Sequence, residues 1–396
     1  MSRVDGCPVC RSPDVRLFLE RDAVPVQQNV LMPDRQSALD IAKGTLRLAS
    51  CADCGFVFNS AFEPAKLSYG ATYDNNQCCS PAFASHVSGL VRHLVTERGV
   101  RNTRIVEVGC GDGSFLKQLV EAGAGNVGVG FDTSYVGPAE DLGGRVRFVR
   151  DYFGPASAGV AADVVICRHV IEHVPDPVAL LRSIRQFAPG ARVFFETPDV
   201  EWILRGRALW DFFYEHCSYF SADSLGTAFE TAGYRVGRVR RVFHDQYLWI
   251  EAEPAPASAP QPAARDAGRV PALAAEFGEA ESRLVGGWRS LVERLAGAGG
   301  VALWGAGAKG VTFANLVDPD RRLVDCVVDI YPVKQGKYVP GTGHAITAYT
   351  SLPRRGVRTA LLMNPNYYGE VAATLASARM EVELIDLTEC ASEDSH

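Results

Sequence analysis

Two segments of this chain each combine an apolar strand, a glycine-rich loop and a helix, and no other feature constrains the fold so strongly. In the first, residues 104–108 read as a strand, 107–113 as a loop and 114–122 as a helix. In the second, residues 300–304 read as a strand and 305–310 as the loop before another helix. A strand that runs through a short loop into a helix begins a βαβ unit, which requires a parallel sheet. We therefore expect an α/β protein with two such sheets.

Further apolar segments at regular intervals extend both sheets. A helix over residues 81–95, with apolar residues at helical spacing, should lead into the first sheet. Residues 234–242 and 246–252 are separated by a short turn and should pair antiparallel where that sheet ends. The remaining expected strands lie at 126–132, 146–151, 162–167 and 191–196 in the first sheet, and at 324–329 and 359–363 in the second.

A change of composition divides the chain into domains. Proline and alanine dominate the start of residues 254–270, which is typical of a semi-rigid linker. We accordingly expect a cysteine-bearing front domain (1–60), a middle domain (61–253) and a rear domain (271–396). The rear domain should begin with a helix over residues 271–296. Two or three domains are also what a length of 396 residues favours.

Composition and charge narrow the classes of partner. Hydrophobic residues make up 47%, charged residues 22%, and the net charge is −6, so neither nucleic acid nor an anionic membrane is an expected partner. The start of the sequence has no apolar segment of the signal-peptide type, and no run of 18 apolar residues occurs, so we expect a cytoplasmic protein. The sequence does not determine the oligomeric state, for which a monomer is our expectation.

Four of the eleven cysteines form two Cys-x-x-Cys pairs, Cys7 with Cys10 and Cys51 with Cys54. A two-residue gap within a turn points both thiolates toward one centre, and four thiolates in a tetrahedron suit Zn²⁺. We expect a structural site, because four thiolates leave no open coordination position. The long segment between the pairs should form hairpins of its own. The alternative is free cysteines at chance spacing, since a chain without a leader favours metal ligands or free thiols over disulfides.

The first glycine loop is of the type that binds S-adenosylmethionine. Glycines let the backbone approach a ligand closely, and this loop has the required place between a strand and a helix. Asp132, at the end of the next strand, can accept hydrogen bonds from ribose hydroxyls. Asp151, after the third strand, can accept one from an adenine amino group, and the alternative is that it caps a turn at the strand end. An NAD site is the alternative, but the glycine spacing differs from G-x-G-x-x-G. The expected cofactor-binding residues are Glu107, Gly109, Gly111, Gly113, Asp132 and Asp151, together with His169 after the fourth strand.

Polar residues gather after the fourth and fifth strands, at the edge where ligands bind in open parallel sheets. Residues 168–173 and 196–199 follow these strands directly, and the aromatic and polar segment 213–220 comes just after. Histidine titrates near neutrality and can take a proton from a substrate. We expect His216 to be the general base, and a neighbouring carboxylate could orient its ring. The expected catalytic residues are His216, Glu215, Tyr214 and His173.

Structural alternatives remain open for several of these residues. Each histidine could be a packed or capping residue, with His169 the most and His216 the least suited to that interpretation. Tyr69 and Tyr73, upstream of the middle domain's first strand, could cover the pocket or simply pack.

The rear loop fits a dinucleotide site by spacing alone. Gly305, Gly307 and Gly310 follow a strand and precede a helix, with Asp325 and Asp329 about 20 residues further on. Tight packing of the strand against the helix explains the same glycines. Because methyl transfer needs no hydride, we expect no nicotinamide cofactor here.

With these residues assembled, the chain resembles the three-domain sugar C-methyltransferases that act on nucleotide-linked keto-deoxysugars in antibiotic biosynthesis. The resemblance covers nearly the whole chain. The resemblance is carried by the four cysteines, the first glycine loop, residues 214–220, and the rear segments 304–310, 333–344 and 363–368. One departure is Phe213, because characterised sugar enzymes tend to have a tyrosine directly before the Tyr-Glu-His triplet.

The resemblance implies a front domain that carries zinc, a class I S-adenosylmethionine-dependent methyltransferase domain and a Rossmann-like rear domain without nicotinamide. It also implies that His216 acts as the base. The expected reaction is C-methylation of a nucleotide-linked (dTDP) 4-keto-deoxysugar next to its ketone. The alternatives are O- or N-methylation of another small metabolite, and a binding protein with a vestigial donor loop. The acceptor, the methylated carbon and the stereochemistry do not follow from the sequence.

Overall fold

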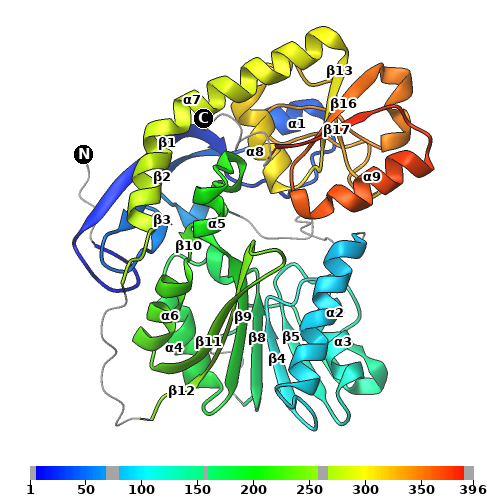
Figure 1. Ribbon diagram of the computed structural model, residues 1–396. Coiled ribbons are helices and arrows are strands. Elements are labelled where there is room, and N and C mark those ends of the chain that lie inside the picture. The colour runs from blue at the N-terminus through cyan, green and yellow to red at the C-terminus, as the bar shows by residue number, and fades with distance from the viewer. Residues whose placement is uncertain (1–5, 68–79, 155–158, 257–265, 388–396) are drawn as a thin grey trace.

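The computed structural model describes residues 6–67, 80–154, 159–256 and 266–387, and arranges them around three sheets (Figure 1). This architecture confirms the expected mixture of parallel α/β sheets with a small front domain. Among the described helices, none is both long and apolar enough to cross a membrane.

The front sheet is antiparallel and has four strands in the order β1-β2-β3-β10. Strands β1 and β2 form the hairpin expected between the cysteine pairs, and the five-residue helix α1 lies in their connection. The last strand, β10, was not expected here, because it follows the Tyr-Glu-His triplet in the middle domain and pairs with β3. The elements are β1 (Val15–Pro25), α1 (Arg35–Leu39), β2 (Lys43–Cys51), β3 (Val57–Asn59) and β10 (Ser218–Tyr219).

The middle sheet has eight strands in the order β11-β12-β9-β8-β4-β5-β7-β6. Strands β9, β8, β4, β5 and β7 run parallel, and β12 is antiparallel to β9 and β11, so the expected antiparallel pair is confirmed. The strands are β4 (Arg104–Val108), β5 (Val127–Phe131), β6 (Glu140–Asp141), β7 (Val146–Val149), β8 (Val164–Arg168), β9 (Arg192–Pro198), β11 (Tyr234–Val242) and β12 (Tyr247–Pro254).

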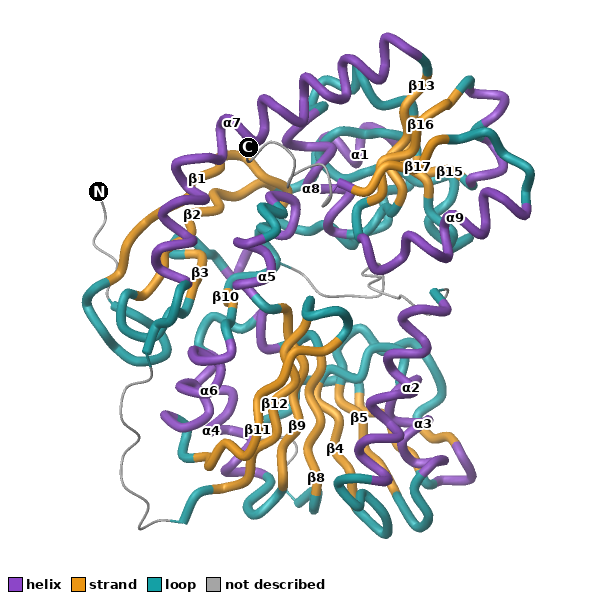
Figure 2. Tube along the Cα trace, in the orientation of Figure 1, coloured by secondary structure: helices purple, strands orange, loops and turns teal. Residues whose placement is uncertain are grey.

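Helices cover both faces of the middle sheet, with α2 and α3 on one face and α4 and α6 on the other (Figure 2). Alternation along each strand separates the two cores, so that Ile105 packs with α2 and α3 while Val106 packs with α4 and α6. Local capping defines where helices start: the Ser221 hydroxyl accepts from the backbone N–H of Ser224 at the start of α6. The helices are α2 (Pro81–Thr96), α3 (Ser114–Ala122), α4 (Pro177–Phe187), α5 (Val200–Arg205) and α6 (Ala222–Thr231).

The rear sheet has five parallel strands in the order β15-β14-β13-β16-β17. Helix α7 is 29 residues long and runs from the front sheet to the rear sheet (Figure 1). The elements are α7 (Val270–Ala298), β13 (Gly300–Trp304), α8 (Ala308–Val317), β14 (Cys326–Val328), β15 (Ile346–Thr347), β16 (Val357–Leu362), α9 (Tyr368–Ser377) and β17 (Glu383–Asp386). Short 3₁₀ helices occur at Pro64–Lys66, Leu142–Gly144, Ile171–His173, Leu209–Asp211, Tyr349–Ser351, Pro353–Arg355 and Pro365–Tyr367.

The front sheet and the rear domain share one hydrophobic core. The fully buried Trp210 lies at its centre, with ring centroids 5.7 Å from Trp288 on α7 and 5.8 Å from Phe313 on α8. Such aromatic pairs contribute beyond the area that they bury. The rear domain is therefore packed firmly over the segment that joins α5 to β10.

Within the rear domain, the glycine loop between β13 and α8 is also closely packed, and a substitution can test this. A Cβ at Gly310 would lie 1.9 Å from the carbonyl oxygen of Gly305, so Gly310→Ala should lower the free energy of unfolding by about 1–3 kcal/mol. Urea unfolding followed by circular dichroism measures this change. The control is Gly286→Ala in α7, where no atom lies within 4 Å and the better helix propensity of alanine should be neutral or stabilising. Equal stability of Gly310→Ala and the parent protein would contradict the close packing.

Candidate active site

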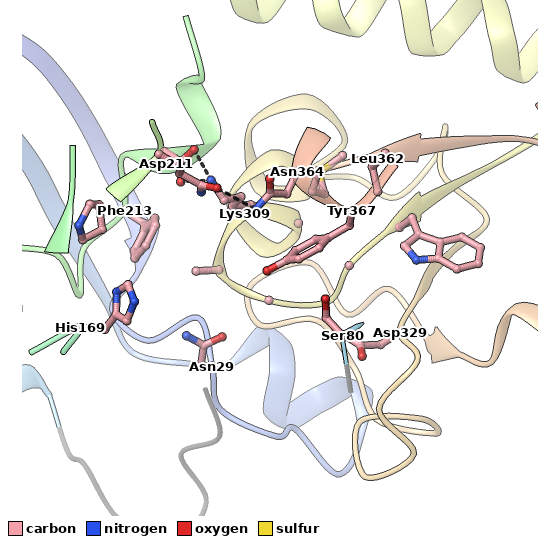
Figure 3. A pocket seen from close by; sticks show the side chains of 18 of the residues that line it. Asn29, Ser80, His169, Asp211, Phe213, Lys309, Asp329, Leu362, Asn364 and Tyr367 are labelled. Carbon is pink, nitrogen blue, oxygen red and sulfur yellow. Dashed lines mark hydrogen bonds and ion pairs between the residues drawn. The ribbon is translucent and has the colours of Figure 1, made fainter. Parts of the chain in front are cut away.

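A cavity of about 240 Å³ lies between the middle sheet and the rear domain (Figure 3). Its middle-domain wall includes His169, His173, Phe213 and His216, and Asn29 reaches it from the front domain. The rear wall includes Trp304, Gly305, Lys309, Asp329, Lys334 and Tyr367. The expected acid–base residues and the rear glycine loop therefore face the same space.

The three glycines of the first loop all have positive φ angles, as residues 107–113 require for a tight turn from β4 into α3. At Gly109 a Cβ would meet Val170 at 2.1 Å, and at Gly113 it would meet Phe148 at 2.4 Å. Gly111 has no atom within 4 Å of such a Cβ, so the loop is open at its tip. The loop is thus closely packed on two sides and accessible to a ligand at its middle glycine.

Asp132 lies at the end of β5 and contacts the loop directly. Its carboxylate accepts from the backbone N–H of Gly111 at 2.8 Å and from the hydroxyl and N–H of Ser134. Asp151 is exposed and accepts from the N–H of Tyr152 at 2.7 Å. Contacts of Asp132 with ribose and of Asp151 with adenine remain predictions, and both carboxylates are placed at strand ends as the sequence indicated.

A buried charge cluster lies beside the loop, at the ends of β8 and β9. Glu196 is fully buried and receives the guanidinium of Arg168 at 2.8 Å and the ring of His86. His169 lies 3.4 Å from Glu196 and 3.4 Å from Glu172. Burial would lower the pKa of His169, but the two carboxylates outweigh it and raise that pKa to about 9. His169 is therefore a cation in the cavity wall at neutral pH.

His86 was not found from the sequence. It lies on α2 and contacts Glu196 across 110 positions of the chain. The sequence predicts the helix that contains His86, but a single histidine on a helix does not indicate which distant residue it contacts.

His216 lies on the cavity wall with a ring centroid 4.8 Å from His173 and 4.1 Å from Phe213. Burial, and next the nearby His173 and His169, lower the pKa of His216 well below its usual value. The pKa of His173 is also lowered by burial, and its Nδ1 lies 3.0 Å from the backbone carbonyl of Glu215. His216 is therefore a neutral imidazole at neutral pH, which is the form that can accept a proton.

Tyr214 and Glu215 point toward the front domain and do not line the cavity. The Tyr214 hydroxyl accepts from the backbone N–H of Glu63 at 2.9 Å, and the Glu215 carboxylate accepts from that of Gln28 at 3.0 Å. Burial raises the pKa of Glu215 to about 8. The expected orientation of the His216 ring by this carboxylate is replaced by a different geometry, because residues 214 and 215 form a turn and the Glu215 carboxylate binds the backbone of Gln28. Tyr69 and Tyr73 lie outside the described residues.

The rear wall contributes charged residues that the sequence did not single out. Lys309 follows the rear glycine loop, and its ammonium lies 2.5 Å from both carboxylate oxygens of Asp211, close to the cavity (Figure 3). Lys334 lies 3.8 Å from Asp329, whose carboxylate also accepts from the N–H of Ala306 in the loop. Asp325 instead accepts from Val301 at the start of β13, away from the cavity.

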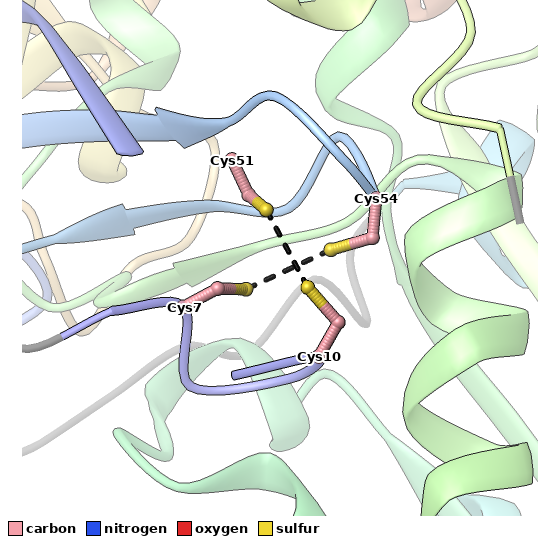
Figure 4. A group of neighbouring side chains, drawn as sticks. All are labelled: Cys7, Cys10, Cys51 and Cys54. Carbon is pink, nitrogen blue, oxygen red and sulfur yellow. Dashed lines mark hydrogen bonds between the residues drawn. The ribbon is translucent and has the colours of Figure 1, made fainter. Parts of the chain in front are cut away.

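The four expected metal ligands converge in the front domain (Figure 4). The Sγ atoms of Cys7 and Cys54 are 3.6 Å apart, those of Cys10 and Cys51 are 3.5 Å apart, and all four lie within 4.8 Å of one another. Four thiolates around Zn²⁺ would be separated by about 3.8 Å, because each Zn–S bond is about 2.3 Å long. The geometry thus fits a tetrahedral zinc site, and Zn²⁺ there would join the start of the chain to β2.

Elemental analysis should find about one zinc per chain in the purified protein. Cys54→Ser should lose the metal and lower the unfolding temperature, because three thiolates bind zinc less tightly and a structural zinc, when bound, contributes to folding stability. The matched control is Cys326→Ser, which changes a buried thiol in β14 far from the cluster and should keep the zinc. The zinc site would be contradicted if the purified parent protein contains no metal and if addition of zinc leaves its unfolding temperature unchanged.

Comparisons with known proteins agree with this geometry. Residues 83–239 match a family described as "Methyltransferase domain", and residues 271–384 match the "C-methyltransferase C-terminal domain". The fold and site thus define an S-adenosylmethionine-dependent methyltransferase. The chain thus combines a methyltransferase domain with a C-methyltransferase C-terminal domain.

One relative extends over almost the whole chain. C-methyltransferase NovU of Streptomyces niveus is 27% identical over 359 residues, which cover 86% of this chain and 84% of that protein. Ubiquinone biosynthesis O-methyltransferase of Ralstonia nicotianae is 34% identical over 101 residues, which cover 24% of this chain and 42% of that protein. Among solved structures, magnesium protoporphyrin IX methyltransferase of Synechocystis PCC 6803 with bound SAH is 19% identical, covers 44% of this chain and 84% of its own, and has a TM-score of 0.36.

Proposed function

We propose that this protein methylates a carbon next to the ketone of a nucleotide-linked 4-keto-deoxysugar, of the dTDP type, in natural-product biosynthesis. The observation that carries the proposal is the neutral His216 in a cavity bounded by the middle sheet and by a second domain with two lysines. A nucleotide-linked sugar has a ketone-bearing ring at one end and a diphosphate at the other, so it matches a cavity with a base on one side and cations on the other.

The reaction needs a base because a carbon next to a ketone becomes a nucleophile only after it loses a proton. His216 would take that proton, and the resulting enolate carbon would attack the activated methyl group. S-adenosylmethionine supplies that methyl group on its sulfonium when it is bound at the first glycine loop. His169, a cation in the same wall, is placed to stabilise negative charge on the enolate oxygen.

Tyr214 and Glu215 support this reaction as positioning residues. Glu215 binds the backbone of Gln28 in the front domain and Tyr214 binds that of Glu63 just after it, so both hold the turn that precedes His216. Phe213 takes the place of the tyrosine typical of sugar enzymes, and its ring packs against His216. The missing hydroxyl changes what this wall offers an acceptor and leaves the base in place.

Two other functions compete with this proposal. An O- or N-methyltransferase would use His216 to deprotonate a hydroxyl or amine. The O-methyltransferase of Ralstonia nicotianae, however, matches only 24% of the chain, whereas the C-methyltransferase NovU matches 86% of it. A non-catalytic binding protein is disfavoured by the intact loop and by the paired charges around the cavity. An assay with labelled donor and a panel of acceptors, read by mass spectrometry and NMR, separates all three.

Substitution of the base tests the mechanism. His216→Asn should lower kcat by about 10²–10⁴-fold, because a positioned base contributes that much, while donor affinity stays near that of the parent protein. The same variant should slow the exchange of the acceptor's α-proton into deuterated water when S-adenosylhomocysteine replaces the donor. Steady-state kinetics and NMR measure the two effects.

Two variants serve as controls for this experiment. His244→Asn changes an exposed histidine in the turn between β11 and β12 and should leave both rates unchanged. His173→Asn should have a smaller effect than His216→Asn, because His173 is held by the backbone of Glu215. Full turnover and full proton exchange in His216→Asn would place the base elsewhere, with His173 the next candidate.

The rear domain is proposed to bind the nucleotide end of the acceptor, without a nicotinamide cofactor. Calorimetry should therefore detect no micromolar binding of NADH or NADPH. Lys309→Met should raise KM for the acceptor by about tenfold or more, because it removes a charged donor, and should not change the affinity for S-adenosylhomocysteine. Lys66→Met, at an exposed lysine that does not line the cavity, is the control. Tight binding of NADH would refute the absence of a nicotinamide site. An unchanged acceptor KM in Lys309→Met would refute the binding of the acceptor's nucleotide end by the rear domain.

A further inference from the structure

Gln246 is a buried amide in the cavity wall that the proposed reaction does not yet use. It lies in the turn between β11 and β12 and is 4% exposed. Its side chain offers one acceptor atom, Oε1, and two hydrogen-bond donors on Nε2. The direction of these two atoms decides what this part of the wall presents to a bound molecule.

Two asparagines of the rear domain determine which way the amide points. The Nδ2 atoms of Asn364 and Asn366 lie 3.1 Å and 2.8 Å from Oε1 of Gln246. Backbone groups identify both nitrogens. Nδ2 of Asn366 also donates to the carbonyl of Phe243 at 3.2 Å, and Oδ1 of Asn364 accepts from the N–H of Asn366 at 3.1 Å. Because a carbonyl can only accept and an N–H can only donate, both asparagines present donors to Gln246, and the atom between them is its oxygen.

With Oε1 held by the rear domain, Nε2 of Gln246 points elsewhere. Within the part of the chain that the structure describes, no acceptor lies at hydrogen-bond distance from Nε2. Nε2 is not one of the partnerless side-chain atoms that are sealed inside the described structure, so it remains accessible. Since the residue is otherwise enclosed and lines the cavity, the amide donor faces that space.

The backbone holds Gln246 in place as well. The three preceding residues, Phe243, His244 and Asp245, have φ angles of 51°, 54° and 63°, which are unfavourable for residues other than glycine. The N–H of Gln246 donates to the carbonyl of Phe243 at 3.2 Å, and its carbonyl accepts from the N–H of Asp199 at 3.0 Å. Backbone strain of this kind persists where surrounding contacts impose it, and it is concentrated at functional sites. The donor is thus fixed in position before any ligand binds.

A neutral, fixed donor at this position suits a ketone or hydroxyl oxygen. The next residue, Tyr247, has its ring 4.7 Å from that of His169, while the amide contacts the rear domain. Gln246 therefore lies between the wall that contains the proposed base and the wall that contains the two lysines. Phosphate groups are bound best by charged side chains, so the amide suits the ring of a nucleotide-linked sugar better than its diphosphate.

We propose that Gln246 donates a hydrogen bond from Nε2 to an oxygen substituent of the acceptor's sugar ring, and that Asn364 and Asn366 hold its amide in the required orientation. Gln246 is thereby a residue that specifies the acceptor, because a site with a fixed donor discriminates against molecules that lack the matching oxygen. The inference rests on the proposed function, since it requires the acceptor in the cavity, and it concerns neither the base nor the methyl donor.

Two ligands that share the nucleotide end provide the test. dTDP-4-keto-6-deoxyglucose has the sugar ring, whereas dTDP lacks it. Gln246→Glu keeps an oxygen toward both asparagines and replaces the NH₂ donor by a second carboxylate oxygen. Calorimetry with S-adenosylhomocysteine bound should show that this variant weakens the keto sugar about 10–100-fold and changes dTDP by less than about twofold, because only the former loses a hydrogen bond.

Acid should restore the binding of the keto sugar to Gln246→Glu. A protonated carboxyl group carries an O–H that can donate in place of the amide. The affinity of the variant relative to that of the parent protein should therefore rise as the pH is lowered and the introduced carboxylate takes up a proton. Taking the ratio removes the pH dependence that both proteins share, and a purely structural role of Gln246 would not produce this recovery.

Gln118→Glu is the matched control. Gln118 is exposed on α3 and does not line the cavity, so the same change of charge should leave both affinities unchanged. Thermal unfolding of each variant verifies that it is folded. If Gln246→Glu does not fold, Gln246→Met, which removes the donor without adding a charge, should weaken the keto sugar selectively.

The outcomes separate this inference from the proposed function. Equal weakening of both ligands would mean that Gln246 only joins the two domains, and unchanged affinity for both would mean that it does not contact the sugar. Either result overturns the inference and leaves the proposed function standing. If the parent protein binds neither ligand, the proposed acceptor is wrong and the inference fails with it.

Discussion

The segment between α5 and α6 is the constraint on which the active site depends, because residues of all three domains hold it. Asp211 binds Lys309 of the rear domain, the Glu215 carboxylate binds the backbone of Gln28 in the front domain, and the Glu215 carbonyl lies 3.0 Å from His173 of the middle domain. Strand β10 also adds a strand to the front sheet. His216 lies in the middle of these anchors and has no hydrogen bond of its own within the described structure. His216 is thus held by its neighbours on the chain, and as the proposed base it would have its ring nitrogens available for the substrate.

Much of the fold could be predicted from local patterns. Helix α3 and strands β4, β11 and β13 lie where apolar periodicity and glycine loops placed them, because each depends on residues that are near in sequence. The cysteine cluster was also predictable, since the two-residue spacing within each pair is itself the local geometry. The carboxyl ends of parallel strands then brought His169 and His173 to one edge.

What could not be predicted depends on contacts between distant residues. The pairing of β10 with β3, the ion pair of Lys309 with Asp211 and the contact of His86 with Glu196 each join segments that are about 100 residues or more apart. The direction of a side chain in a turn also could not be predicted. The sequence placed Glu215 next to His216, but the chain turns the two toward different domains.

The long helix α7 links the front sheet to the rear sheet through a shared core, while the first glycine loop belongs to the middle sheet. The proposed donor and acceptor surfaces therefore belong to different sheets, and both sheets contribute residues to the wall of the cavity. Under the proposed function, substitutions at rear-wall residues such as Trp304 or Tyr367 would change acceptor binding and leave the first glycine loop, and with it the supply of the methyl group, unaltered.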